Sequence, residues 1–388
     1  MKSILFIHQS AELYGSDKTI LMFISGLDRT KYFPVVILPF DGPLKTEMEK
    51  NNIKVVIAPV LKLYRKMFTP SNLLSFFKEY KTGFKTIGDL HKQHDFKLVY
   101  SHTLAALIGI LFARKNKITH LWHVQEILAR PRFINRAFTW LLSRPYNHKA
   151  VYDSQETMHF WIKGEPKLAA KSDFVWNGLD VSQKIDHTPA EVASVRKDFF
   201  KADDSETVIG LVGRINSWKG QQLLLEAFKI LSDQRKDIRL VYVGSPPPNQ
   251  DFFLDDLNKK ISEYNLQDKV TIVPFQQDIW KFWDSLDIAV VPSTEPEPFG
   301  MVAIEAMMAR KPVVAANHGG LTEIVVDGET GFRFEPNNIQ ALASAIEKLL
   351  NDPDMRKRFG EKGRARAIEH FSLENHIAKF EKIFAELI

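Results

Sequence analysis

The sequence predicts an α/β protein with two Rossmann-like domains, each a doubly wound parallel sheet, facing a central cleft. Its 388 residues are enough for two domains with a core each. Short β-branched apolar runs recur between longer helical patterns, and the second half of the chain repeats the plan of the first. These runs are continuous rather than alternating, which is typical of parallel strands covered on both faces.

The expected strands divide the chain into two domains. They are residues 3–8, 34–40, 54–60, 97–102, 119–124 and 149–154, followed by 207–215, 238–245, 269–275, 287–293 and 311–317. We therefore expect an N-terminal domain over 1–182, a polar linker over 183–204 and a C-terminal domain over 205–371. Open α/β sheets bind ligands at the carboxyl ends of their strands, so the cleft between the domains is the expected site.

The composition excludes several classes of protein. With 45% hydrophobic and 26% charged residues, it is that of an ordinary globular protein. No apolar run reaches the ~18–20 residues of a membrane-spanning helix, and the N-terminal apolar stretch is too short for a signal peptide. The absence of cysteine excludes disulfides and thiolate chemistry, and it fits a reducing cytoplasm.

The net charge of +5 is unevenly distributed. Residues 1–180 hold 26 basic and 15 acidic residues, a net charge of +11, and the remainder has a net charge of −6. Two stretches of this basic half, 62–97 and 130–149, mix basic with aromatic residues, as amphipathic helices on anionic bilayers do. In the alternative interpretation the aromatic residues pack inward and the bases are solvated. Nucleic acid is not the expected partner.

The segment EPEPFGMVAIE, residues 295–305, has a carboxylate at each end of an apolar run. A residue before proline favours extended backbone, so Glu297 is expected in a loop, and Pro298 suits the first turn of a helix over 299–309. Apart from Glu305 that helix has no polar face, which predicts that it is buried. A buried carboxylate needs a partner.

The segment GLVGRINSWKG, residues 210–220, places Arg214 and Lys219 in the turn between a strand and a helix. The planar fork of arginine and the mobile charge of lysine suit a diphosphate, which a helix N-terminus also attracts. The alternative is two solvated surface bases. The segment matches neither a P-loop nor a dinucleotide fingerprint.

Three further segments follow expected strands. The loop 8–19 contains Gly15 and Ser16, which either bring N–H groups close to a phosphate or simply begin a helix. His123 lies at the end of the strand at 119–124 and Glu126 follows it, and a lone histidine in such a place is more often structural.

The third of these segments is Gly319-Gly320, which precedes a helix and is shaped for close approach to an anion.

A metal site is not expected. The sequence has no H-x-x-x-H pair, and its one D-x-D pair, at 352–354, is better explained as helix capping.

Taken together, these motifs resemble those of the retaining glycosyltransferases of family 4 (glycosyl transferases group 1), which have the GT-B fold. The resemblance runs along the whole chain. Its most specific element is the E-x7-E pair of Glu297 and Glu305, and GRxxxxKG at 213–220 falls in the family's order. The final segment, 372–388, resembles the terminal helix that packs back on the N-terminal domain.

The resemblance implies roles for the residues of the second half. Arg214 and Lys219 would hold the diphosphate of a nucleotide-sugar donor and stabilise the leaving group. Glu305 would accept hydrogen bonds from the ribose, and Glu297 would face the hydroxyl groups of the sugar. The other donor contacts that it implies involve Phe299, Gly300 and Met301.

In the first half, the resemblance aligns His123 with the family's catalytic histidine near the reacting sugar. Gly15 matches one position of a donor-binding loop that is often Gly-Gly, and here the second position is Ser16. The segment 244–252 departs from the family's glycine-rich turn, which leaves the base and the donor sugar open.

The implied activity is that of a retaining hexosyltransferase that needs neither metal nor cofactor. It would move a sugar from a nucleotide-sugar, such as a UDP-sugar, to a glycan or lipid-linked glycan in cell-envelope polysaccharide synthesis. The expected location is the cytoplasm, with peripheral attachment to the inner face of the plasma membrane. The alternatives are a nucleotide-sugar epimerase of the same fold and a non-catalytic GT-B partner subunit.

A two-carboxylate glycosidase is a weaker alternative. Glu297 and Glu305 belong to one loop-helix unit, which leaves no evident division into acid and base.

Overall fold

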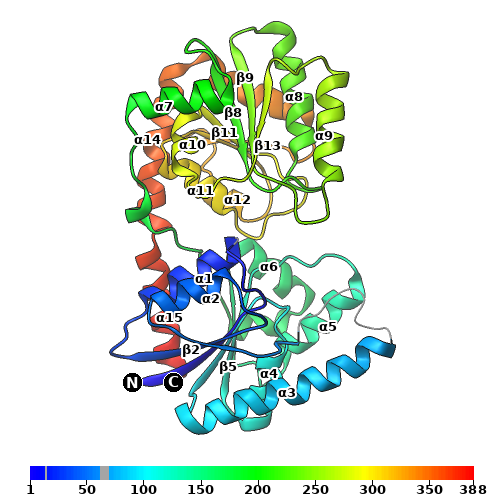
Figure 1. The fold of residues 1–388 in the computed structure, drawn as a ribbon, viewed down its shortest axis with the longest axis vertical. Coiled ribbons are helices and arrows are strands. Elements are labelled where there is room, and N and C mark those ends of the chain that lie inside the picture. The colour runs from blue at the N-terminus through cyan, green and yellow to red at the C-terminus, as the bar shows by residue number, and fades with distance from the viewer. Residues whose placement is uncertain (14, 62–69) are drawn as a thin grey trace. The chain divides into compact units, whose positions relative to one another are not determined.

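The structure is a computed structural model that describes residues 1–13, 15–61 and 70–388. The chain divides into two compact units (Figure 1). Unit 1 comprises Met1–Gly178 and Leu373–Ile388, and unit 2 comprises Leu179–Ser372. Within the described residues, no helix is both long and apolar enough to cross a membrane.

Unit 1 is built on a parallel sheet of seven strands in the order β3-β2-β1-β4-β5-β6-β7. The strand order reverses between β1 and β4, and such a switch point is where doubly wound sheets bind ligands. The register across it pairs Ile7 of β1 with Ser101 of β4. The strands are β1 (Lys2–Ile7), β2 (Tyr32–Leu38), β3 (Lys54–Ile57), β4 (Leu98–His102), β5 (Thr119–Val124), β6 (Lys149–Tyr152) and β7 (Ser172–Phe174).

Helices cover both faces of this sheet, which explains why β1 is apolar at successive positions. Ile4 and Phe6 enter the core formed with α1 and α15, whereas Leu5 and Ile7 enter the core formed with α3 and α4. A strand with two buried faces has no polar side. The helices of unit 1 are α1 (Gly15–Gly26), α2 (Pro43–Lys50), α3 (Pro70–His94), α4 (Ile108–Asn116), α5 (Arg132–Ser143), α6 (Gln155–Gly164), the 3-10 helix η1 (Pro166–Lys171) and α15 (Leu373–Leu387).

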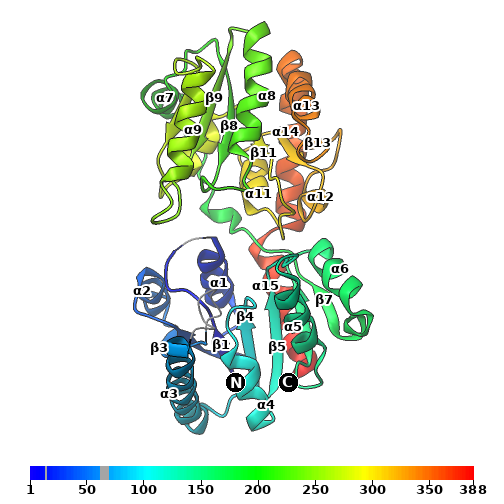
Figure 2. The same ribbon diagram turned by 90° about the vertical axis from the view of Figure 1, so that its right-hand side faces the viewer.

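Helix α15 belongs to unit 1 although it follows unit 2 in the sequence (Figures 1 and 2). Phe380 and Phe384 pack against Phe23 of α1 in the same core. Glu381 accepts a hydrogen bond from the backbone N–H of Asp28 at 2.8 Å. Aromatic packing and a charge-assisted bond thus attach the end of the chain to the first domain.

Unit 2 repeats the architecture with a six-stranded parallel sheet in the order β10-β9-β8-β11-β12-β13. Its switch point lies between β8 and β11, so the loops after these two strands meet at one edge. The strands are β8 (Thr207–Val212), β9 (Ile238–Val243), β10 (Val270–Val273), β11 (Ile288–Val291), β12 (Val313–Ala316) and β13 (Gly331–Phe334).

The helices of unit 2 also lie on both sides of their sheet. Helices α8 and α9 face the viewer in Figure 2, and α7, α10 and α14 lie on the opposite side in Figure 1. The elements are η2 (Val181–Gln183), α7 (Pro189–Val195), η3 (Arg196–Phe200), α8 (Gln221–Gln234), α9 (Phe252–Glu263), α10 (Trp280–Ser285), α11 (Met301–Met308), α12 (Leu321–Ile324), α13 (Ile339–Asn351) and α14 (Pro353–His370).

Residues 183–204, which the sequence analysis expects to be a linker, lie within unit 2. Thr188 caps α7 through a capping box with Glu191. The fully buried side chain of Lys184 pairs with Asp284 at 2.8 Å. Because a buried ammonium group needs a carboxylate partner, this pair binds the stretch to the domain.

Two strands have no counterpart in the sequence analysis, namely β7 and β13. Both are edge strands, paired on one side. Residues of β7 are half-buried, and β13 has the sequence GFRF, with half-buried residues at its centre. Neither is a continuous apolar run, because an edge strand is not covered as fully as a central one.

Candidate functional site

The loop between β11 and α11 carries the first acid of the E-x7-E pair. Gly300 ends this loop with φ +121°, and a Cβ there would lie 2.7 Å from Leu321 Cδ2. A helical residue cannot adopt that φ, so α11 begins at Met301. The predicted helix start at Phe299 is therefore two residues too early, and Pro298 lies in the loop.

Glu297 is the more buried of the two acids, with 4% of its surface exposed. Its Oε1 accepts hydrogen bonds from Lys219 Nζ at 2.6 Å and from Ser293 Oγ at 2.6 Å. Two donors on one oxygen offset the cost of burying this carboxylate. The sequence predicts a diphosphate-binding role for Lys219 but not this ion pair.

Glu305 is half-buried on α11, and the indole Nε1 of Trp283 in α10 donates to its Oε2 at 3.2 Å. Met301 and Val302 are also half-buried, whereas Ala303, Ile304 and residues 306–309 are buried. The prediction of a helix buried on all sides is thus wrong for the side that bears Glu305. Met301 and Val302 on that side are apolar, so the sequence did not indicate that they are only half-buried.

The loop between β8 and α8 is shaped by one asparagine and one glycine. Asn216 Oδ1 accepts from the backbone N–H groups of Trp218 and Lys219 at 3.2 and 2.9 Å. Gly220 has φ +79°, and a Cβ there would lie 2.0 Å from the carbonyl oxygen of Pro292. The turn therefore lies directly against the strand end that leads to Glu297.

The two predicted phosphate-binding cations differ in exposure. Lys219 Nζ lies 4.4 Å from the ring centroid of Trp218 and pairs with Glu297, with 16% of its side chain exposed. Arg214 is exposed, and its backbone carbonyl accepts from Gln221 Nε2 at 2.8 Å. Exposure leaves the guanidinium of Arg214 accessible to a ligand, and Lys219 is held in place.

The Gly319-Gly320 turn fits closely around the loop of Glu297. A Cβ on Gly319, where φ is +58°, would lie 2.2 Å from the carbonyl oxygen of Glu297, and one on Gly320 would lie 2.6 Å from Phe299 Cα. The N–H of Gly320 donates to the same Glu297 carbonyl at 2.8 Å. These glycines permit close approach of the protein's own backbone, whereas the sequence analysis ascribed their close approach to an anion.

In unit 1, the predicted phosphate-binding loop leads directly into a helix. Gly15 is the first residue of α1 and is exposed, and a Cβ there would have nothing within 4 Å. Ser16 is half-buried in the same first turn. Among the described residues, which exclude position 14 and positions 62–69, nothing around Gly15 requires glycine.

His123 lies inside the core of unit 1, with 1% of its surface exposed. Its Nδ1 shares a hydrogen bond of 2.6 Å with the hydroxyl of Tyr100, and its ring packs against Phe380 of α15. Burial holds the pKa of His123 well below its usual value, and the nearby His376 lowers it further. Among the described residues, its Nε2 is buried without a hydrogen-bond partner, so the ring is not fully satisfied as a structural histidine would be.

Three residues that the sequence analysis did not select meet at the switch point of unit 1. His8 Nε2 lies 2.6 Å from Asp17 Oδ1, and His8 Nδ1 lies 2.9 Å from His102 Nδ1. All three side chains are buried. The signal was present in the sequence, because the expected strands 3–8 and 97–102 both end in histidine, and their register places these ends side by side.

Glu126 also lies at this edge of the sheet, after β5. Its carboxylate accepts from the backbone N–H groups of Leu104 and Gln125 at 3.0 Å each. Loss of hydration raises the pKa of Glu126 to about 7, although these N–H groups oppose the shift.

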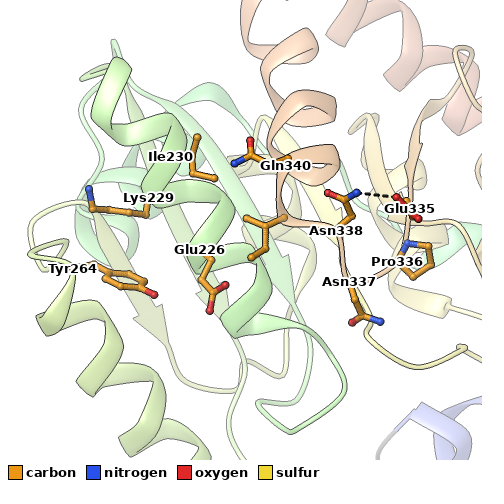
Figure 3. Close-up of a pocket in the computed structure, with 10 residues that line it drawn as sticks. Glu226, Lys229, Ile230, Tyr264, Glu335, Pro336, Asn337, Asn338 and Gln340 are labelled. Atoms are coloured by element: carbon orange, nitrogen blue, oxygen red, sulfur yellow. Dashed lines mark hydrogen bonds between the residues drawn. The ribbon is translucent and has the colours of Figure 1, made fainter.

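A hollow of about 710 Å³ lies elsewhere on unit 2, beside α8 and the loop before α13 (Figure 3). Glu226, Tyr264, Asn337 and Gln340 are among its lining residues. The predicted donor residues do not line it. In the described part of the chain, no group of three or more His, Cys, Asp or Glu residues is placed to hold a metal ion.

Comparison with known proteins defines the class of this fold. The structure of HepE from Anabaena in complex with UDP matches with a TM-score of 0.84 and 25% identity, over 100% of both chains. The two Rossmann-like parallel-sheet domains are those of the GT-B fold. Residues 195–366, which include both motifs around Lys219 and Glu297, match the family model of glycosyl transferases group 1.

Curated glycosyltransferases are also similar to parts of the chain. CapM of Staphylococcus aureus, a capsular polysaccharide biosynthesis glycosyltransferase, is 33% identical over 178 residues, or 46% of each chain. The lipopolysaccharide 1,2-N-acetylglucosaminetransferase of Salmonella typhimurium is 31% identical over 239 residues, or 60% of this chain and 61% of that one. The chain thus spans about half the length of the curated relatives that it matches. Together the comparisons show the GT-B fold and a similarity of residues 195–366 to glycosyl transferases group 1.

Proposed function

We propose that the protein is a retaining glycosyltransferase of family 4 that works without a metal. It transfers a hexosyl group from a nucleotide-sugar to a glycan or lipid-linked glycan of the cell envelope. The observation that carries this proposal is the ion pair between Lys219 and Glu297, because it joins the two motifs of the matched segment into one cluster.

The chemistry requires departure of a nucleoside diphosphate. A developing diphosphate charge is stabilised by cations already fixed in position. Lys219 has three N–H donors and one is directed at Glu297, so the others remain for a phosphate oxygen. The exposed guanidinium of Arg214 supplies a planar fork for the same group.

The two acids hold different parts of the donor. Glu305 accepts hydrogen bonds from the ribose, and Glu297 orients the hydroxyl groups of the sugar. The acceptor attacks from the face that the diphosphate leaves, so no carboxylate acts as nucleophile. The catalytic role that the resemblance implies for His123, near the reacting sugar, stays a prediction, and its ring is buried against Phe380 of α15.

The nature of the acceptor is supported by two relatives. CapM and the Salmonella enzyme are named for capsular polysaccharide and lipopolysaccharide chemistry respectively. An acceptor of this kind is either a growing glycan or a lipid-linked one. The second would bring the protein to an anionic membrane surface.

Helix α5 has a surface that fits such a membrane. Phe133 and Trp140 lie two helical turns apart with 64% and 52% of their surfaces exposed, and Arg132 and Arg136 are exposed beside them. Residues 127–152 contain no acidic side chain. Exposed aromatic residues on a basic amphipathic helix enter the interface of anionic bilayers.

The second basic stretch, 62–97, lies partly outside the described residues, since Arg65 and Lys66 are not described. In its described part, Phe77, Lys81 and Lys85 of α3 are exposed. This stretch would add attraction to an anionic surface.

A thermal-shift panel of nucleoside diphosphates, followed by a transfer assay, tests the donor proposal. A binding partner of the folded state raises Tm, and the best nucleotide-sugar should then be consumed only with an acceptor glycan present. Conversion of the free nucleotide-sugar into its epimer would favour the epimerase. Binding with neither reaction would favour a non-catalytic partner subunit.

Vesicle pelleting tests the membrane proposal. The protein should pellet with phosphatidylglycerol vesicles and be released as salt shortens the screening length. Phe133→Ser with Trp140→Ser, or Arg132→Glu with Arg136→Glu, should each reduce pelleting and leave nucleotide binding unchanged. Equal pelleting with neutral vesicles, or none with anionic ones, would leave a soluble glycan as the acceptor.

A further inference from the structure

We infer that Ser293 and Trp283 are positioning residues, each of which orients one acid of the E-x7-E pair. The inference deepens the proposed function and rests on it, because it concerns how Glu297 and Glu305 are held toward the donor. Neither residue belongs to the motifs that identify the family in the sequence analysis.

Ser293 holds Glu297 by a hydrogen bond within the loop between β11 and α11. Its side chain is fully buried, and its hydroxyl donates to Glu297 Oε1 at 2.6 Å. The backbone carbonyl of Ser293 in turn accepts from His318 Nε2 at 2.8 Å. The serine that holds Glu297 is therefore itself held by the loop after β12.

The two carboxylate oxygens of Glu297 differ in their hydrogen bonds. Lys219 and Ser293 both donate to Oε1, and in the described part of the chain no hydrogen bond to Oε2 accompanies them. Two donors on one oxygen fix the carboxylate plane, so the direction of Oε2 is set before a ligand arrives. Oε2 is then the oxygen that would accept from a sugar hydroxyl.

Trp283 fixes Glu305 in a different way. Its indole is 1% exposed, and Nε1 donates to Glu305 Oε2 at 3.2 Å. A buried indole has no rotatable donor, so this N–H points in one direction only. The bond reaches from α10 to α11 and selects the rotamer of Glu305 on the half-exposed side of that helix.

Substitutions can remove each donor with little change of shape. Ser293→Ala and Trp283→Phe delete the O–H and the N–H, and benzothienylalanine at 283 replaces the N–H by sulfur in a ring of the same size. Ser293→Thr keeps the hydroxyl. Matched controls are Ser285→Ala, a buried serine whose hydroxyl bonds to a backbone carbonyl, and Trp161→Phe, which loses an indole bond to a backbone carbonyl in unit 1.

The experiment measures kcat in the transfer assay, and Kd by calorimetry for the nucleoside diphosphate with the largest thermal shift. Ser293→Ala should lower kcat about tenfold and leave Kd within about twofold, and Ser293→Thr should recover most of the loss. Trp283→Phe, or benzothienylalanine if that variant does not fold, should raise Kd about tenfold with a smaller effect on kcat at saturation. The two control variants should change neither quantity by more than about twofold.

Double-mutant cycles decide whether these residues act through the acids. In a Glu297→Ala background, which removes the acceptor oxygen, Ser293→Ala should cost no further kcat, and in a Glu305→Ala background Trp283→Phe should cost no further affinity. Losses that multiply would overturn the inference and leave Ser293 and Trp283 as ordinary core residues. Failure of the proposed function is distinguishable, because the wild type itself would then transfer no sugar.

Discussion

The polar clusters of the two units differ in how charge is used. In unit 2, Lys219 and Glu297 form an ion pair at the carboxyl ends of β8 and β11, and the lysine stays partly exposed. In unit 1, the histidines at the ends of β1 and β4 are buried around Asp17. Burial depresses the pKa of His102 far below its usual value, so that this ring is neutral at pH 7. The stability of unit 2 should therefore fall when one charge of the Lys219–Glu297 pair is removed, and that of unit 1 should fall when a buried histidine is protonated.

The largest expected effect comes from breaking the ion pair of unit 2. Lys219→Ala leaves the buried carboxylate of Glu297 without its cation and should destabilise unit 2 by about 3 kcal/mol. It should also weaken nucleotide binding, by roughly 1.5–3 kcal/mol. Hydrogen exchange resolved to unit 2 peptides would measure the first effect and calorimetry the second.

Arg214→Ala separates these two effects. The exposed arginine should affect stability by less than about 0.5 kcal/mol and still weaken nucleotide binding.

In the Lys219→Ala background, Glu297→Gln should recover part of the lost stability, because it removes the unpaired charge. No recovery would contradict the ion pair as the source of the loss.

Lowering the pH should destabilise unit 1. The pKa values of His102 and His123 are well below 6.5 in the folded chain, and that of His376 is about 4, in each case mainly because burial disfavours the charged ring. Below pH 6.5 the unfolded chain binds protons that these buried histidines do not bind in the folded unit, so the stability that they contribute is full above pH 6.5 and is lost as the pH drops toward 4. Glu126 opposes this slope, because its raised pKa of about 7 makes the folded unit gain stability as the pH falls below 7. His376 alone should account for on the order of 3 kcal/mol.

Denaturant unfolding between pH 7.5 and 4, followed by hydrogen exchange in each unit, measures this slope. His376→Phe should flatten the pH dependence of unit 1, and the exposed His159→Gln should leave it unchanged. A slope equally steep in unit 2 peptides would show that the buried histidines are not its cause.

The smallest expected effects compare two glycines of the candidate sites. Gly319→Ala forces a Cβ against the Glu297 carbonyl at a positive φ and should cost about 1–3 kcal/mol, with a loss of transfer. Gly15→Ala meets nothing and should change stability by less than about 0.5 kcal/mol. If Gly15→Ala nevertheless abolished nucleotide binding at unchanged Tm, the phosphate-binding prediction for that loop would gain its first support.

The fold could be predicted further than the site. Central strands such as β1 and β8 can be predicted from the sequence, because two buried faces require uninterrupted apolar residues. The edge strands β7 and β13 lack that requirement, and neither was predicted. The start of α11 was predicted two residues early, because only the structure shows that Gly300 has φ +121° and so lies before the helix.

The candidate site shows the same limit. Spacing along one loop and helix was enough to select Glu297 and Glu305 as a pair. It could not show that Glu297 is the more buried acid, that Lys219 pairs with it, or that Ser293 and Trp283 hold the two carboxylates. The contacts of Lys219 and Trp283 join residues from different elements, and local patterns carry no information on such pairs. Ser293 lies four residues before Glu297 in the same loop, but this spacing alone does not show that the two side chains meet.

The sequence by itself determined the two doubly wound domains and the motifs around Lys219 and Glu297, because these depend on apolar periodicity and on short spacings within one segment. The tertiary structure decided which polar groups are buried and what they bond. His8 and His102 are 94 residues apart, and only the register of β1 against β4 makes them neighbours. Burial and pairing are properties of the packed sheet, and the free energy of a charge depends on both.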